Sequence, residues 1–482
     1  MLRTMEVRDL EPKQVWKNFS DLNDVPRPSK KEERVIEFAK NFGKNLGLET
    51  YIDPVGNVII KKPSSAGMEN RKTVILQSHL DMVHQKNADT NFDFDTQGIE
   101  MLIDDGWVTA NGTTLGADNG MGVAAIMSLL ESKDIPHPAL EALFTIDEET
   151  GMTGAFGLEK GILKGQILLN LDTEDDDEFS IGCAGGIDTN TKYKYKTESA
   201  TGKAYKISVS GLRGGHSGMD IHLGRGNANK IMNRLTWNCQ DFGLRFSEIN
   251  GGSLRNAIPR ESFATITINS DTYLQEFEKR ASEIKAEQKL ADPNIQITIE
   301  PAEMPELVMC ANDVYKIGKA IRSVHNGVYR MSLAIPALVE TSSSLSRVIV
   351  KEGEFVTQSL QRSSVDSAKM DIAYTVGSAF GLMGCEVEHT GSYPGWEPNP
   401  NSEILDLMVD KYKITFNEDP KVQSCHAGLE CGILGEKLPG VDMISFGPTI
   451  RNPHSPDEKV KIDTVQKFWD FLVDVLKDTP LK

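Results

Sequence analysis

Short, almost continuous apolar runs alternate with helical patterns in the first part of the chain. The runs lie at residues 74–76, 142–146 and 167–171. Apolar side chains at helical spacing in residues 30–46 predict an amphipathic helix, and the apolar stretch 121–130 predicts a second helix. Strands that are apolar at successive positions are buried on both faces, as in parallel sheets covered by helices. This part of the chain is therefore predicted to be an α/β domain.

The pattern changes near residues 185–186. Residues 205–212, 263–268 and 295–299 alternate apolar and polar side chains, which indicates strands with one face in water. Two successive stretches share the order helix, strand, helix, strand: 227–238, 263–268, 271–290 and 295–299, then 314–324, 355–360, 365–380 and 385–389. We interpret this segment as a duplicated α+β layer, although no residue-level repeat is visible.

The α/β pattern returns after the loop at residues 392–396. A predicted helix at 404–412, an apolar run at 443–446 and a helix at 464–476 follow this loop. The simplest architecture is a fold of the α/β class. One α/β domain, formed by residues 1–186 and 392–482, is interrupted by an inserted lid domain at residues 187–391.

The composition restricts the classes of function. The 482 residues carry 52 Lys plus Arg against 70 Asp plus Glu, a net charge of −18 that argues against nucleic acid as a partner. No apolar stretch is long enough to span a membrane, and residues 1–28 lack the apolar core of a signal peptide. Six cysteines without a C-x-x-C pair are typical of reduced thiols. We therefore expect a cytoplasmic protein.

Residue types that bind metals follow the predicted buried strands and precede one predicted helix. They are His79, Asp81, Asp118, Glu148, Glu149, Asp172 and His454. In open α/β sheets the ligand crevice lies beyond the carboxyl ends of the strands, so these segments are expected to meet. Two imidazoles with several carboxylates suit zinc or manganese. Because the carboxylates exceed what one ion needs, they indicate two ions about 3.5–4 Å apart, bridged by one carboxylate.

Each of these residues also has an ordinary structural explanation. His79 is compatible with a hydrogen-bonded core histidine, and Asp118 before a helix is compatible with an N-cap. Glu148 and Glu149 are compatible with a solvated surface pair, and Asp172 with the start of a solvated acidic loop. Their joint placement after buried strands favours the metal site over these alternatives.

The motifs resemble those of a known family. They are H-L-D at 79–81, L-G-A-D-N-G at 115–120, D-E-E-T-G at 147–151, N-L-D at 170–172 and N-P-H-S-P-D-E at 452–458. Further matches are P-R-P-S at 26–29, G-G-H-S-G at 214–218, N-A-I-P at 256–259, H-A-G-L-E-C-G at 426–432 and M-I-S-F-G-P at 443–448. The set is similar to that of the aminoacyl-histidine dipeptidases, also called cytosol non-specific dipeptidases, among the co-catalytic zinc exopeptidases. The resemblance implies a zinc-exopeptidase-like α/β catalytic domain with an inserted, duplicated α+β lid domain.

The resemblance also implies the roles of the metal ligands. Asp118 would bridge two Zn²⁺ ions per chain, for which Mn²⁺ or Co²⁺ can substitute. His79 and Asp172 would hold one ion, and Glu149 and His454 the other. No ligand position departs from the family pattern.

Two further acidic residues receive catalytic roles from the resemblance. Asp81 would hydrogen-bond the ring of His79 and fix its tautomer. Glu148 would be the general base, taking a proton from the attacking water and passing one to the leaving amine. Similar enzymes carry a cis peptide after the bridging aspartate, so the bond from Asp118 to Asn119 is expected to be cis.

The lid and the last α/β segment supply candidates for substrate binding. The family's lid histidine corresponds to His216, which would donate a hydrogen bond to the oxyanion. Arg362 has the fork-shaped donor that a substrate carboxylate needs, and a solvated or ion-paired arginine is its alternative. Asn256 is a candidate for the same subsite, and Glu430 for binding the α-ammonium of the substrate.

The sequence thus predicts a metal-dependent dipeptidase that hydrolyses unblocked dipeptides, Xaa-His and others. The alternative is an N-acyl amino-acid deacylase or another amidohydrolase of the same fold, which would need no ammonium site. A non-catalytic binding relative is a second alternative, against which the presence of Glu148 argues. The expected partner is a dipeptide, with no nucleic acid and no membrane. The oligomeric state, a homodimer included, is left open.

Overall fold

The computed structural model describes residues 6–333, 335–399 and 401–482, which form two compact units. The first unit contains the residues up to Gly182, together with Pro398–Ser424 and Leu429–Lys482. The second unit contains Cys183–Glu397 and the short segment Cys425–Gly428. The sequence pattern places the changes after residues 186 and 391 and does not predict the return of residues 425–428 to the inserted unit.

An eight-stranded sheet organises the first unit. Its strands, in spatial order, are β1 (Glu49–Ile52), β2 (Val58–Lys62), β6 (Leu140–Thr145), β3 (Val74–His79), β7 (Ile167–Asn170), β23 (Asp442–Ser445), β8 (Glu178–Cys183) and β22 (Lys421–Cys425). The four central strands β6, β3, β7 and β23 are parallel to their neighbours in this group. Because β3, β6 and β7 are buried at every position, the prediction of strands covered on both faces is confirmed.

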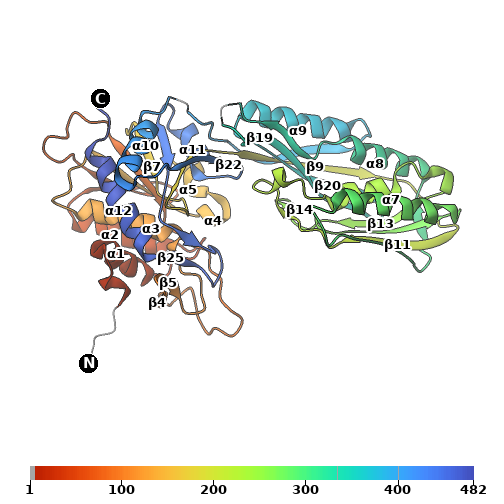
Figure 1. Cartoon of the computed structure of the whole chain (residues 1–482), viewed down its shortest axis with the longest axis horizontal. Helices are drawn as coiled ribbons and strands as arrows, with labels where there is room; N and C mark the ends of the chain where they lie inside the picture. The colour runs from red at the N-terminus through yellow and green to blue at the C-terminus, as the bar shows by residue number, and fades with distance from the viewer. Residues whose placement is uncertain (1–5, 334, 400) are drawn as a thin grey trace. The chain divides into compact units, whose positions relative to one another are not determined.

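The helices of the first unit lie around this sheet (Figure 1). They are α1 (Lys13–Asn23), α2 (Glu33–Asn45), α3 (Ala117–Glu131), α4 (Glu148–Gly151), α5 (Thr153–Gly157), α10 (Glu403–Phe416), α11 (Glu430–Lys437) and α12 (Ile462–Lys477). A four-stranded sheet joins β24 (Ile450–Arg451), β25 (Lys459–Lys461), β5 (Trp107–Ala110) and β4 (Met101–Asp104). Every residue of α3 after Asp118 and before Glu131 is buried, which explains why its sequence is apolar rather than amphipathic. Among the described residues no helix has the length and apolarity to cross a membrane.

One sheet also organises the second unit. Its strands, in spatial order, are β16 (Gln296–Pro301), β11 (Lys203–Ser210), β15 (Ser262–Ile268), β13 (Arg245–Gly251), β19 (Val339–Lys351), β20 (Glu354–Ser363), β9 (Gly185–Lys194) and β21 (Glu386–Tyr393), and β18 (Gly327–Met331) pairs with β19. Two smaller pairs join β10 (Thr197–Ser199) to β17 (Leu307–Met309) and β12 (Gly215–His216) to β14 (Ala257–Ile258). The helices are α6 (Ala228–Thr236), α7 (Thr272–Gln288), α8 (Ala311–Ser323) and α9 (Asp366–Gly381).

The topology of this sheet explains the repeated order seen in the sequence. One half contains β11, α6, β13, β15, α7 and β16, and the other β9, α8, β19, β20, α9 and β21. In both halves the strands lie in the spatial order fourth, first, third, second, which is the arrangement of a split βαβ fold. The halves meet where β13 pairs with β19, so the duplicated layers form one continuous sheet. Figure 1 shows α7, α8 and α9 lying along this sheet, and all four helices share one hydrophobic core with its strands.

Candidate metal centre

Five side chains of the first unit form two groups that share Asp118. In one group, Nε2 of His79 lies 3.3 Å from Oδ1 of Asp118 and 3.6 Å from Oδ1 of Asp172. In the other, Nε2 of His454 lies 3.2 Å from Oδ2 of Asp118 and 3.0 Å from Oε2 of Glu149. The two oxygens of one carboxylate therefore face two different histidines, which is the arrangement that a bridging ligand requires.

The parallel strands explain why these residues meet. His79 is the last residue of β3, Asp172 follows the end of β7, and Glu149 lies in α4 directly after β6. The carboxyl ends of neighbouring parallel strands lie at the same edge of the sheet, so short loops deliver all three side chains to one place. Asp118 enters from the start of α3 and His454 from the loop after β24.

The backbone around Asp118 departs from the helix in which it is counted. The peptide bond from Asp118 to Asn119 is cis, as the resemblance implies. Both residues have non-helical dihedral angles, and the amide of Asn119 donates a hydrogen bond to the carbonyl of Leu171. The carboxylate of Asp118 contacts the two histidines and accepts from no backbone N–H among the described residues, so the interpretation as an N-cap is wrong.

Electrostatics show that this cluster suits a cation. Burial raises the pKa of Asp172 to about 7, and the carboxylates of Asp118 and Glu149 add to the rise although His79 opposes it. Hydrogen bonds with Asp118 and Glu149 raise the pKa of His454 to about 11. Oε1 of Glu149 is buried without a hydrogen-bond partner among the described residues. Buried carboxylates need a positively charged partner, and a set of nitrogen and oxygen ligands of this kind fits divalent ions.

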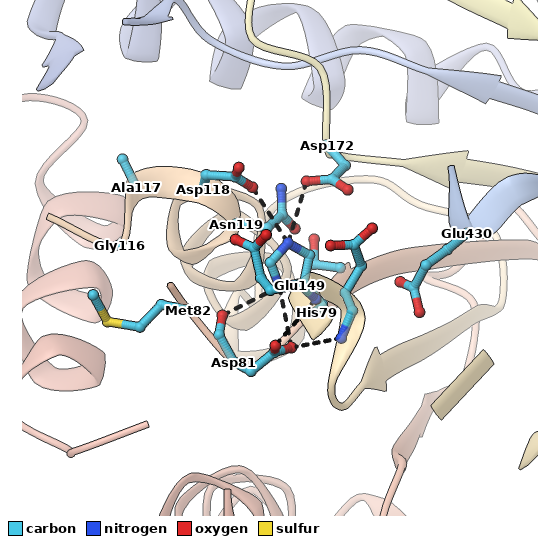
Figure 2. Close-up of polar contacts among 12 residues, drawn as sticks. His79, Asp81, Met82, Gly116, Ala117, Asp118, Asn119, Glu149, Asp172 and Glu430 are labelled. Carbon is cyan, nitrogen blue, oxygen red and sulfur yellow. Dashed lines mark hydrogen bonds and ion pairs between the residues drawn. The ribbon is translucent and has the colours of Figure 1, made fainter. Parts of the chain in front are cut away.

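Asp81 contacts both the first histidine and the turn that carries the glutamates. Nδ1 of His79 lies 3.1 Å from the carbonyl oxygen of Asp81 and 3.4 Å from its carboxylate (Figure 2). The same carboxylate accepts hydrogen bonds from the hydroxyl of Ser29 at 2.8 Å and from the backbone N–H groups of Glu148 at 3.1 Å and Glu149 at 3.3 Å. Asp81 therefore fixes the orientation of the imidazole and of the two glutamates together.

Glu148 and Glu430 are acidic groups beside the cluster. Glu148 offers a carboxylate oxygen within 4.8 Å of ligand atoms of His79 and Glu149. Burial raises its pKa well above the usual value, and although the charge of His79 opposes this, Asp172 and Glu430 add to it. Its carboxylate is thus poised to hold a proton.

Glu430 begins α11 and is buried (Figure 2). One of its oxygens accepts hydrogen bonds at 2.7 Å from both the amide of Gln77 and the hydroxyl of Thr145. The other oxygen is buried without a partner among the described residues, and burial raises the pKa of the carboxyl to about 8 although His79 opposes the rise. A donor group, such as an ammonium, would satisfy the second oxygen.

The remaining predicted residues lie together in the second unit. Nη2 of Arg362 lies 3.3 Å from Nε2 of His216, and Nη1 donates a hydrogen bond to the hydroxyl of Tyr393 at 2.8 Å. The carbonyl of Asn256 accepts from the N–H of Ser217, the residue after His216, at 2.8 Å. Arg362 is only 4% exposed and takes part in none of the ion pairs of the described residues, so its interpretation as a solvated or ion-paired arginine is wrong.

His216 is a neutral hydrogen-bond donor in this arrangement. Burial and the charge of Arg362 lower its pKa to about 4. Nδ1 accepts hydrogen bonds from the N–H groups of Gly218 at 3.2 Å and Met219 at 3.0 Å. A neutral ring that accepts at Nδ1 carries its proton on Nε2, which is the atom beside Arg362.

The structure shows three further residues to which the sequence analysis assigns no role. Tyr393 orients Arg362, as described above. Arg27, within P-R-P-S, and Glu458, which ends N-P-H-S-P-D-E, are both buried beside the loop that carries Asp118. For these two residues the available sequence signal was their position inside motifs that match the family.

The sequence profile of Peptidase family M20/M25/M40 matches residues 75–478. The chain belongs to this family. This peptidase is therefore a hydrolase of peptide bonds, as the motifs predict, and together with the two ligand groups the family establishes that it uses divalent metal.

Relatives that match nearly the full length of the chain support the family assignment. The cytosol non-specific dipeptidase of Escherichia coli (strain K12) is 41% identical over 99% of this chain and 100% of that protein. The crystal structure of aminoacylhistidine dipeptidase from Vibrio alginolyticus is 44% identical with a TM-score of 0.94 and covers 99% of both chains. Aminopeptidase PepT from Bacillus cereus, at 15% identity, a TM-score of 0.56 and coverage of 98% and 99%, shares the fold. The predictions of family and fold class are confirmed.

Proposed function

We propose that this peptidase hydrolyses the peptide bond of unblocked dipeptides, Xaa-His among them, with two Zn²⁺ ions per chain. The observation that carries the proposal is Asp118, whose two oxygens face His79 and His454 separately. The names of the relatives, cytosol non-specific dipeptidase and aminoacylhistidine dipeptidase, support the substrate class. The name of the first relative also supports a cytoplasmic location.

The five clustered residues would hold the metals. His79 and Asp172 would bind one ion, Glu149 and His454 the other, and Asp118 both. When bound, such ions act as Lewis acids that polarise a carbonyl and lower the pKa of water. Mn²⁺ or Co²⁺ can take the place of Zn²⁺ in a set of this kind.

Glu148 would move the proton. It would accept one from the attacking water and deliver it to the leaving amine. The raised pKa supports this role, because the carboxyl must retain the proton until the amine leaves. Asp81 would act as a positioning group, since its carboxylate holds the backbone N–H of Glu148.

The donors of the second unit would bind the oxygens of the substrate. Nε2 of His216 and Nη2 of Arg362 lie 3.3 Å apart, and two donors that face each other in this way need acceptor oxygens. We assign the substrate carboxylate to Arg362, with Asn256 at the same subsite, and the developing oxyanion to His216. The unpartnered oxygen of Glu430 would accept the α-ammonium.

A panel of dipeptides tests this proposal. Free dipeptides, including several that end in His, are expected to be hydrolysed. The same dipeptides with an N-acetyl group are expected to react at least about 10²-fold more slowly in kcat/KM, because the buried carboxyl of Glu430 would be left without its partner. Amino-acid release is the measurement, and N-acetyl amino acids are included in the panel. Preferred hydrolysis of the N-acyl compounds would show a deacylase instead.

We further propose that one chain supplies the complete set of groups. The resemblance implies that a lid with a single α/β layer would be about half as long as the insertion in this chain, and that in enzymes with such a lid the oxyanion histidine can come from a partner subunit. Here two such layers occur in one chain, joined through β13 and β19. The second layer would replace the partner's lid, so that His216 and Arg362 act in the chain that carries them.

Mixing two inactive variants tests this arrangement. His216→Ala is expected to lower kcat by about 10²–10³, because it removes one donor to the oxyanion. Mixing it with Glu148→Gln chains is expected to restore nothing, since each chain lacks one group that it must supply itself. The activity of the mixture is measured after unfolding and joint refolding, with differently tagged chains as the control for mixed assemblies. Substantial recovery would show that His216 acts on the partner chain.

A further inference from the structure

Glu458 makes an unusual set of hydrogen bonds within the first unit. It is 1% exposed, and each of its oxygens accepts two backbone N–H groups. Oε2 accepts from Leu115 at 2.8 Å and Gly116 at 2.9 Å, and Oε1 accepts from Ala117 at 2.8 Å and Asp118 at 3.2 Å. One carboxylate thus binds four consecutive N–H groups and ends at the shared residue of the two ligand groups.

The loop needs this acceptor because of its own conformation. Gly116 has φ of 70° and ψ of 30°, and Asp118, the second residue of α3, has φ of −82° and ψ of 109°, so the chain is not helical up to this point. The first N–H groups of a helix have no carbonyl partner within the helix. In a buried loop these groups must find an acceptor elsewhere, and Glu458 supplies it.

Arg27 holds the same loop by donating a hydrogen bond to the backbone carbonyl of Gly116. Arg27 is 1% exposed, and its guanidinium donates hydrogen bonds to the carbonyl oxygens of Gly116 at 2.6 Å, Leu80 at 3.1 Å and Asp81 at 3.2 Å. The last two follow His79 directly. Arg27 therefore ties the loop of Asp118 to the turn after β3.

We propose that Glu458 is a positioning residue for the metal centre. It lies four residues after His454, and its bond to Asp118 joins positions 340 residues apart in the sequence. By holding the backbone of Asp118 it orients the carboxylate so that one oxygen faces each histidine. Together with Arg27 it sets the spacing of the three segments that carry His79, Asp118 and His454.

The substitution Glu458→Gln tests this role. The amide keeps one acceptor oxygen, so two of the four N–H groups would face an NH₂ group that cannot accept. The affinity for Zn²⁺ is expected to fall by about 10–100-fold, the usual effect of losing a group that supports a metal ligand. Affinity is measured by competition with a chromophoric chelator. The visible spectrum of the Co²⁺-loaded variant at saturating metal is expected to differ from that of the parent, because the ligand geometry changes.

Glu141→Gln is the matched control. Glu141, on β6 of the same unit, is also buried, and one of its oxygens accepts from the N–H groups of Lys164 at 2.7 Å and Gly165 at 2.8 Å. It belongs to none of the candidate metal groups. This variant is expected to lose thermal stability while keeping the metal affinity and the Co²⁺ spectrum of the parent.

The possible results separate this proposal from the one on which it rests. If the parent binds no metal, the proposed metal centre fails and this role fails with it. If the parent binds metal and folded Glu458→Gln binds equally well with an unchanged Co²⁺ spectrum, only the positioning role is overturned. A loss of affinity in Glu141→Gln as large as in Glu458→Gln would also overturn it, because the effect would then be general. If Glu458→Gln does not fold, Arg27→Lys is expected to show the affinity loss, and unfolding of both variants would overturn the proposal.

Discussion

Removal of the metals is expected to abolish hydrolysis of dipeptides, and added Zn²⁺ or Mn²⁺ is expected to restore it. Without an ion, nothing polarises the substrate carbonyl, a contribution of several kcal/mol and therefore about 10³-fold or more in rate. The measurement is kcat on one dipeptide before dialysis against a chelator, after it, and after metal is returned. Elemental analysis of the restored protein is expected to give two ions per chain.

Substitution of single carboxylates serves as the control for this metal count. Asp172→Asn removes one predicted ligand and is expected to reduce the count to one ion per chain. Asp175→Asn changes a neighbouring aspartate that pairs with Arg451 at the surface, and it is expected to keep two. Full activity with a single bound ion at saturation, or activity after complete removal, would contradict the two-ion proposal.

The central strands could be predicted because burial on both faces leaves a plain signal. The apolar runs at 74–76, 142–146 and 167–171 lie within β3, β6 and β7, apart from one residue at the end of each of the last two. The predicted helix at 121–130 was shorter than α3, which begins at Ala117, because the bend at Asp118 lies before the apolar stretch. A helix boundary that depends on such a bend produces no periodic pattern of apolar residues in the sequence.

Other strands could not be predicted because their partners lie far away in the sequence. β22 is exposed at its first three residues and carries no hydrophobic pattern. β25 pairs with β5 across the sequence from residues 459–461 to 107–109, and neither strand is long enough to show a period. The order of elements in the second unit revealed the duplication, but not that the halves share one sheet, because pairing of β13 with β19 depends on tertiary contacts.

The same distinction applies to the site. The candidate metal ligands could be predicted because most of them follow recognisable strands and Asp118 precedes a predicted helix, and the structure brings all five together. Arg27 and Glu458 were not, because arginine and glutamate are usually exposed and only their burial and backbone hydrogen bonds reveal what they do. For Arg362 a solvated and a binding role could not be distinguished from sequence, whereas its burial beside His216 argues for binding.

Glu148→Gln is expected to lower kcat by about 10²–10⁴, the usual contribution of general acid–base catalysis. The amide has nearly the shape of the carboxyl group but cannot take up the proton of the attacking water. The turn should remain in place, because Asp81 holds Glu148 through its backbone N–H group, which the substitution leaves unchanged. Steady-state kinetics on a free dipeptide measure kcat and KM, and KM is expected to change little because the substrate carboxylate and ammonium are assigned to other residues.

The adjacent residue provides the control that separates the two glutamates. Glu149 lies 3.0 Å from Nε2 of His454, whereas no metal-ligand histidine approaches Glu148 as closely among the ion pairs of the described residues. Glu149→Gln is therefore expected to lose one of the two ions, and Glu148→Gln is expected to keep both, as measured by elemental analysis after equilibrium dialysis. Metal loss in Glu148→Gln with retention in Glu149→Gln would mean that the two roles are exchanged. If both variants keep two ions and full activity, Glu148 is not the base, and the proton must be carried by another group.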